Sequence, residues 1–142
     1  MKMTACTPVV NTDRIEECKA FYTEHFGFEV TFDSDWYVNI QAPGEKSFDI
    51  GFLKPNHESQ PPIFQPAYHE GISFSIYVES ADDAYAELSA AGVTILHELA
   101  DEPWGERHFV VVDPAGVPLN ICHMIPPADN YIEGYAEGHA AV

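Results

Sequence analysis

A few side chains in this sequence are of the types that bind metal ions or small molecules. His97 and His108 offer imidazole nitrogens and Asp49 offers a carboxylate, and a divalent ion prefers donors of these kinds. A metal site built from His108 with His97 or Asp49 is therefore one interpretation. The other is that His108 is a neutral residue that lines a pocket and only forms hydrogen bonds.

Trp104, in the segment EPWGE, places a large ring on a predicted loop. Such a ring could be the wall against which a planar ligand stacks, because aromatic contacts contribute about 0.5–1.5 kcal/mol beyond the area that they bury. The alternative is a structural tryptophan that anchors its own loop.

Asp49 lies between two apolar residues, Phe48 and Ile50, so we expect its carboxylate to be partly enclosed. An enclosed carboxylate without a partner is costly. The sequence therefore predicts a partner for it, which is Arg14, Arg107, a histidine or a cationic ligand.

The motifs of several common enzyme classes are absent from the sequence. It contains no GxSxG, no phosphate-binding loop and no HExxH. The cysteines Cys6, Cys18 and Cys122 are odd in number and lack CxxC spacing, so we expect buried, inert thiols and neither disulfides nor a zinc knuckle. Asp82 and Asp83 fall in the first turn of a predicted helix, where carboxylates favour the helix dipole, and we assign them no catalytic role.

The net charge of the chain is strongly negative. Six Lys and Arg residues face 23 Asp and Glu residues, which gives −17. A phosphate backbone would be repelled, which excludes nucleic acid as a partner. A cationic ligand would be attracted, although an acidic surface that only keeps the protein dissolved is the alternative.

Length and composition indicate one compact domain. The chain has 142 residues, of which 46% are hydrophobic, enough for a sizeable core. No apolar run approaches the roughly 20 residues of a membrane span. The first ten residues, MKMTACTPVV, lack the apolar core of a secretion signal, so we expect a cytoplasmic protein.

Two parts of the chain repeat one pattern of elements. Residues 14–32 and 80–96 each show apolar residues at helical spacing, then a glycine (Gly27 or Gly92) that ends the helix, then a strand. Ser80 is the expected N-cap of the second helix. Each helix follows one strand and precedes three more, so we predict strands at 4–10, 28–33, 36–41 and 47–53, and at 71–78, 93–99, 107–112 and 117–123. The plan is βαβββ twice, an α+β fold.

Strand alternation predicts which side chains share a face. Ser73, Ser75 and Tyr77 alternate with apolar residues that we expect to pack on a helix. The segment Asp113 to Gly116 fits a type I turn, which pairs His108 with Cys122 and Val110 with Asn120. In the first half, Tyr37 and Asn39 alternate in the same way with Val38 and Ile40. We expect these polar residues to line a concave, ligand-binding surface.

Three segments, TPVV…AFYTEHFGFEV, YVESADDAYAELSAAGV and EPWGERHFVVVDPAGVPLNI, resemble the glyoxalase/bleomycin-resistance/extradiol-dioxygenase (vicinal oxygen chelate) superfamily. The resemblance covers about residues 4–123. It implies paired βαβββ modules, at 4–54 and 71–123, whose mixed sheets curl into a cup with the helices on the outer face. We accordingly expect one domain over residues 1–125, with a linker at 55–70 and an acidic tail at 126–142.

Enzymes of that superfamily hold a divalent metal in the cup with His, Gln or Glu. The matching positions here fall on Thr7, Gly71 and Asn120, none of which is a usual ligand. The resemblance is therefore greatest to the metal-free branch, the bleomycin-resistance proteins, which are acidic homodimers that sequester a cationic antibiotic without chemistry.

We conclude from the sequence that the protein is a homodimer that binds a small cationic or aromatic ligand in the cup, with no metal and no other cofactor. The expected ligand-binding residues are Tyr37, Asn39, Asp49, Ser73, Ser75, Tyr77, Trp104, His108 and Asn120. The first alternative is a metal-dependent lyase, isomerase or dioxygenase whose ligands are displaced to His108, His97 or Asp49. The second is a dimer whose cup is vestigial and which binds a partner.

Overall fold

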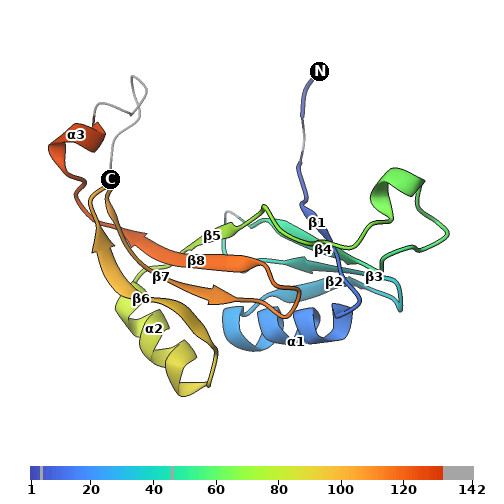
Figure 1. Ribbon diagram of the computed structural model, residues 1–142, viewed down its shortest axis with the longest axis horizontal. Helices are drawn as coiled ribbons and strands as arrows, with labels where there is room; N and C mark the ends of the chain where they lie inside the picture. Colours follow the sequence, from blue (N-terminus) through green and yellow to red (C-terminus); the bar gives the residue numbers. More distant parts are fainter. Residues whose placement is uncertain (4, 46, 133–142) are drawn as a thin grey trace. The chain divides into compact units, whose positions relative to one another are not determined.

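The computed structural model describes residues 1–3, 5–45 and 47–132, and it divides into two compact units. Unit 1 comprises Met1–Gly71 and Asp113–Gly116, and unit 2 comprises Ile72–Val112 and Val117–Val142. In each unit a helix covers one face of an open, four-stranded mixed sheet (Figure 1). The predicted α+β fold of two βαβββ modules is thereby confirmed. Most of the predicted tail, residues 133–142, lies outside the described residues.

Unit 1 contains β1 (Val9–Asn11), α1 (Ile15–Phe26), β2 (Glu29–Asp33), β3 (Tyr37–Gln41), β4 (Asp49–Leu53) and the short 3-10 helix η1 (Pro62–Phe64). The order of strands across its sheet is β1-β4-β3-β2, with β1 parallel to β4 and the other neighbours antiparallel. Helix α1 ends as predicted at Gly27, whose φ of 66° is left-handed and suits a residue without a Cβ.

The core of unit 1 is centred on Tyr22 of α1. Its ring contacts Phe28 and Phe52 with centroid separations of 5.3 and 5.6 Å, and it is fully buried. Its hydroxyl donates a 2.8 Å hydrogen bond to the buried carboxylate of Asp113. Burial and the charge of Asp113 raise the pKa of the phenol far above its usual range, so the group stays a neutral donor.

Unit 2 contains β5 (Phe74–Tyr77), α2 (Ala81–Ala90), β6 (Ile95–Glu102), β7 (Glu106–Val112), β8 (Pro118–Met124) and α3 (Asp129–Ile132). Its strand order, β5-β8-β7-β6, repeats that of unit 1. Ser80 caps α2 as predicted, because its side chain accepts a hydrogen bond of 3.2 Å from the main-chain N–H of Asp83. Apolar side chains of β7 and β8 are fully buried on the face that α2 covers: Phe109, Val111, Leu119 and Ile121.

The first strand of each module is shorter than the sequence predicts. Strand β1 starts at Val9, so Thr7 lies exposed before it. Strand β5 starts at Phe74, and Gly71, which the prediction placed in it, has a left-handed φ of 94° that an extended strand does not adopt. Within the described residues, no helix is both long enough and apolar enough to cross a membrane.

Candidate functional site

The sheet of unit 2 presents a mildly polar surface on the side away from α2, and we call it the polar face of unit 2. Its side chains lie in three rows because the paired residues of neighbouring strands share a face. The rows, read from β5 or β8 to β6, are Ser75–Asn120–Val110–His97, Tyr77–Cys122–His108–Ala100 and Met124–Glu106–Glu102. The predicted pairing of His108 with Cys122 and of Val110 with Asn120 is confirmed.

Two irregularities in β6 determine which of its residues reach this face. The register shifts between Ile95 and His97 and again between His97 and Ala100. In a regular strand, residues an odd number apart point to opposite sides, so His97 and Glu102 would be separated by the sheet. The second shift, which is a β-bulge or an equivalent irregularity, places both of them on the polar face.

Asn120 joins His108 to Glu106 through hydrogen bonds. The Asn120 amide nitrogen lies 3.3 Å from a carboxylate oxygen of Glu106, and its amide oxygen lies 2.6 Å from Nδ1 of His108. A carboxylate only accepts, so the amide nitrogen faces Glu106 and the amide oxygen is left for the histidine. His108 therefore carries its proton on Nδ1, and in the neutral ring Nε2 is an acceptor.

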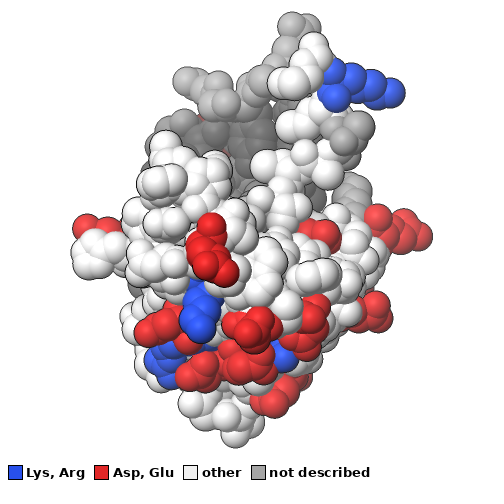
Figure 2. All heavy atoms as spheres, turned by 90° about the vertical axis from the view of Figure 1, so that its right-hand side faces the viewer, with Lys and Arg blue, Asp and Glu red and all other residues white. Residues whose placement is uncertain are grey.

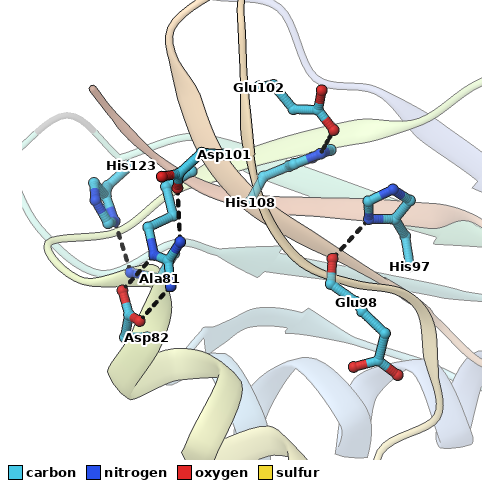
Figure 3. Close-up of polar contacts among 9 residues, drawn as sticks. Ala81, Asp82, His97, Glu98, Asp101, Glu102, His108 and His123 are labelled. Atoms are coloured by element: carbon cyan, nitrogen blue, oxygen red, sulfur yellow. Dashed lines mark hydrogen bonds and ion pairs between the residues drawn. The ribbon is translucent and has the colours of Figure 1, made fainter. Parts of the chain in front are cut away.

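Nε2 of His108 faces the carboxylate of Glu102 at 3.1 Å (Figure 3). His97 lies beside them, with its ring centroid 5.0 Å from that of His108. Nδ1 of His97 lies 2.7 Å from the main-chain oxygen of Glu98, which is an acceptor, so this histidine also carries its proton on Nδ1. One potential metal-binding atom from each of His97, Glu102 and His108 lies within 4.8 Å of the others. Among the described residues, these three side chains form the group whose spacing could hold a metal ion.

Arg107 braces the strand end that carries Glu102. Its guanidinium donates hydrogen bonds of 2.7 and 2.8 Å to Asp82 of α2 and one of 2.6 Å to Asp101 of β6. These bonds lower the pKa of Asp82 and raise that of Arg107. Asp82 thus has a structural partner, and Arg107 ties α2 to the residue next to Glu102.

Aromatic rings flank the polar face of unit 2. The ring of Trp104 is 41% exposed, its N–H donates a 3.1 Å hydrogen bond to Glu106, and its centroid lies 5.9 Å from that of His108. Tyr77 is 62% exposed on β5 and lies two residues after Ser75, so the two side chains share a face. Ser73 is exposed and precedes β5.

Cys122 lies in the middle row but is fully buried. Burial, and to a lesser extent the charge of Glu106, raises the pKa of its thiol to about 12. The thiol therefore stays protonated near neutral pH and is not a nucleophile.

The sheet of unit 1 has its own polar cluster on the side away from α1. Asp49 accepts hydrogen bonds of 3.0 Å from the amides of Asn39 and Gln41, and Asn39 donates another, of 2.7 Å, to Thr31. The partners of Asp49 are thus two amides of the neighbouring strand β3, and not the arginine or histidine that the sequence suggested. Burial and the charge of Asp49 raise the pKa of Tyr37 in the same cluster.

Acidic side chains gather on part of the molecular surface, with a few Lys and Arg side chains between them (Figure 2). In the described residues Lys19 contacts Glu16 and Asp33 at 2.7 and 3.0 Å, and Arg14 contacts Glu17 at 3.5 Å. Exposed pairs of this kind contribute little to stability. Most of the acidic charge is left to act on solution ions and ligands.

The positions to which the resemblance assigns metal ligands do not fit a divalent ion. Thr7 lies outside β1, and Gly71 has no side chain. Asn120 offers one neutral oxygen, which is already bonded to His108. The group His97–Glu102–His108 comes from other strands, and Glu102 is a member that the sequence patterns did not reveal.

Comparisons with known structures show the same fold. Lactoylglutathione lyase from Agrobacterium tumefaciens is 18% identical with a TM-score of 0.67, over 86% of this chain and 94% of that one. TnmS3, an antibiotic-binding protein from Streptomyces sp. CB03234, is 20% identical with a TM-score of 0.66, over 87% and 97%. TioX from Micromonospora sp. ML1 is 16% identical with a TM-score of 0.64, over 87% and 100%.

Sequence comparison gives the family directly. No curated protein sequence matches the chain significantly. The family model described as Glyoxalase/Bleomycin resistance protein/Dioxygenase superfamily, however, matches residues 4–121, which is most of the chain. The chain therefore belongs to the glyoxalase/bleomycin resistance protein/dioxygenase superfamily.

Proposed function

We propose that this protein binds a small cationic or aromatic ligand and does not change it chemically. Binding is supported above all by the exposed ring of Trp104, which lies beside the hydrogen-bonded side chains of Glu106, Asn120 and Ser75. A ring of this kind stacks on planar groups, and the polar side chains supply donors and acceptors that orient a ligand. TnmS3, which has the same fold, is described as an antibiotic-binding protein.

A cationic ligand suits the charge of the site and of the whole chain. Glu102 and Glu106 both lie on the polar face of unit 2, and the net charge is −17. A negative field of this size attracts cations over distances of about 8–10 Å at ordinary ionic strength. We assign Ser73, Tyr77 and His108, the other expected ligand-binding residues of unit 2, to the same role. Within unit 1 we propose separately that Tyr37, Asn39 and Asp49 line a ligand-binding surface of that unit.

We further propose that the protein is a cytoplasmic homodimer. Several large apolar side chains are exposed in the single chain, among them Phe32, Phe48 and Leu96, and a second copy would cover such residues. Cys18 and Cys122 are buried as expected, but the free thiol of Cys6 is exposed, and a free exposed thiol suits a reducing compartment. Sedimentation equilibrium measures the dimer, and a monomer at all concentrations contradicts it.

The binding test uses the fluorescence of Trp104. Trp36, which stacks on His57 with a centroid separation of 4.5 Å, is first replaced in a Trp36→Phe variant so that Trp104 is the sole tryptophan. Metal-free bleomycin is the cationic probe, and a neutral aromatic compound is its control. We expect saturable quenching that weakens as salt rises from about 0.05 to 0.5 M, and ligand recovered unchanged by chromatography.

Two results would contradict the proposal. One is the absence of saturable binding by any cationic or aromatic compound in calorimetry. The other is a new product in the recovered ligand, which would make the protein an enzyme. A Trp104→Leu variant in the otherwise unchanged chain separates the two roles of this residue: a stacking Trp104 lowers affinity when removed, whereas a loop anchor lowers stability.

A further inference from the structure

We infer that His97, Glu102 and His108 form a binding site for one divalent transition-metal ion. The site uses β6 and β7 of unit 2 and none of the positions Thr7, Gly71 and Asn120 at which the resemblance places ligands. The inference of a metal site is independent of the small-molecule binding proposed above, because the experiments below add the metal ion alone.

The distances suit a single ion. Two ligands that each lie about 2.1 Å from one ion are about 3.0–3.4 Å apart in octahedral or tetrahedral geometry. His108 Nε2 and Glu102 Oε1 are already 3.1 Å apart. The donor atom of His97 lies within 4.8 Å of both, and its side chain is exposed, so a modest rotation closes the remaining gap.

Hydrogen bonds occupy Nδ1 of both histidines and leave Nε2 of each ring without its proton. Glu106 orients the Asn120 amide, Asn120 accepts from Nδ1 of His108, and the Glu98 main chain accepts from Nδ1 of His97. Both rings then present the Nε2 lone pair, which is the form in which histidine binds a metal. Ligating histidines typically donate their other N–H to a carbonyl or carboxylate in this way.

The contact between His108 and Glu102 needs a positive charge. With its proton on Nδ1, a neutral His108 directs a lone pair at a carboxylate oxygen 3.1 Å away, and two acceptors repel each other at that distance. Either a metal ion between them or a second proton on the ring, at Nε2, removes the repulsion. Both side chains are largely buried, at 10% and 20% exposed, so water screens the charges poorly.

The donor set defines the class of metal. Two imidazoles and one carboxylate favour Zn²⁺, Fe²⁺, Co²⁺ or Ni²⁺ over Mg²⁺ and Ca²⁺, which prefer oxygen alone. Three protein ligands leave at least one coordination position open, and His97 is on the exposed side of the group. An exogenous ligand with oxygen or nitrogen donors could occupy that position.

The first experiment measures metal in the unmodified protein. The chain is incubated with excess Zn²⁺, Co²⁺ or Mg²⁺, desalted, and analysed for bound metal, and the Co²⁺ form is also examined by visible absorption. We expect near-stoichiometric Zn²⁺ and Co²⁺, little Mg²⁺ and an absorption band of coordinated cobalt. Loss of all three metals on desalting would overturn the inference.

Variants then show where the metal binds. Glu102→Gln keeps the size of the side chain and His97→Ala removes an exposed one, and each should weaken Zn²⁺ binding at least about tenfold in a competition titration. His57→Ala and His69→Ala are the matched controls and should bind as the unmodified chain does. Equal binding by all four variants would show an adventitious ion only and would overturn the inference.

A measurement without substitutions covers the case in which a variant fails to fold. Long-range ¹⁵N–¹H spectra of the unmodified protein report the protonation of each histidine ring nitrogen. Addition of Zn²⁺ should shift Nε2 of His97 and His108 and leave His57 and His69 unchanged. Shifts confined to other histidines would overturn the inference.

Discussion

Nδ1 of His108 and the amide oxygen of Asn120 are 2.6 Å apart across the β7–β8 hairpin. Asn120, which stands at one of the positions where the resemblance places a metal ligand, thus orients a histidine. Its amide nitrogen is held by Glu106 and by Ser75, at 3.3 and 3.4 Å, so the orientation of the amide is determined by three neighbours.

We predict that Asn120→Ala weakens Zn²⁺ binding by roughly 10–100-fold, because His108 loses the acceptor that keeps its proton on Nδ1. Competition with a chromophoric chelator measures the affinity. Asn39→Ala removes an amide from the polar cluster of unit 1 and is the control that should leave Zn²⁺ affinity unchanged. Equal affinities for Asn120→Ala and the unmodified chain would contradict the role of Asn120.

Tyr22→Phe should destabilise the protein by about 1–3 kcal/mol, because a buried carboxylate, Asp113, loses a hydrogen-bond donor while the packing of the ring is kept. Urea unfolding followed by circular dichroism measures the change. Tyr85→Phe removes a hydroxyl that donates to Glu98 on the surface, and its effect should be much smaller. A Tyr22→Phe protein as stable as the unmodified one would refute the prediction.

Gly51→Ala should displace the ring of Tyr37. A Cβ placed on Gly51 would lie 3.0 Å from Cζ and 3.1 Å from Cε2 of Tyr37, closer than such atoms normally approach. We expect a cost of about 1 kcal/mol in the free energy of unfolding. In a Tyr37→Ala background the ring is absent and the cost should largely vanish, so a double-mutant cycle measures the coupling. Strictly additive effects would show that the ring does not lie against Gly51.

The thiols should differ sharply in reactivity. Burial raises the pKa of Cys18 and of Cys122 to about 12, whereas Cys6 is exposed. At about pH 8, iodoacetamide should therefore modify Cys6 alone in the native protein and all three cysteines in urea, as read by mass spectrometry. Rapid native modification of Cys122 would contradict its burial.

The same two thiols predict a loss of stability in alkali. Burial raises the pKa of both thiols in the folded protein from the ordinary 9.0 to about 12, so the unfolded chain releases these protons first as the pH rises. Their contribution to stability is complete below about pH 9 and is lost between about pH 9 and 12. A Cys18→Ala, Cys122→Ala chain should show a flatter decline of the urea midpoint over that range.

The sequence alone predicts the hairpin of unit 2 well for a physical reason. The turn at 113–116 is formed by Asp113 and Gly116, whose main-chain oxygen and nitrogen are 3.0 Å apart, and the turn length determines every pair that follows. The position of His108 opposite Cys122 depends on nothing else. The helix ends at Gly27 and Gly92 are equally local, and both glycines have left-handed φ angles.

Features that depend on distant residues were not predictable in this way. The partners of Asp49 are amides on the neighbouring strand, and nothing near Asp49 in the sequence distinguishes them from a cation. The sequence pattern does not indicate Glu102, because side chains that alternate regularly from His97 onward would place Glu102 on the opposite face of the sheet. Irregularities in a strand have no reliable sequence signature, whereas turns and helix caps do.

The register shifts in β6 have a consequence for how such a site could arise or disappear in relatives. Removing one residue between His97 and Ala100 would restore regular alternation there and leave His97 and Glu102 four positions apart, so both would stay on the polar face of unit 2. If the strand became regular with no residue removed, the two would be five positions apart and Glu102 would turn to the opposite face. The same pair of ligands is thus compatible with two different spacings, and the site is lost when the spacing and the irregularity no longer match. An alignment that scores only residue identity at fixed strand positions would overlook it in one homologue and overcount it in another.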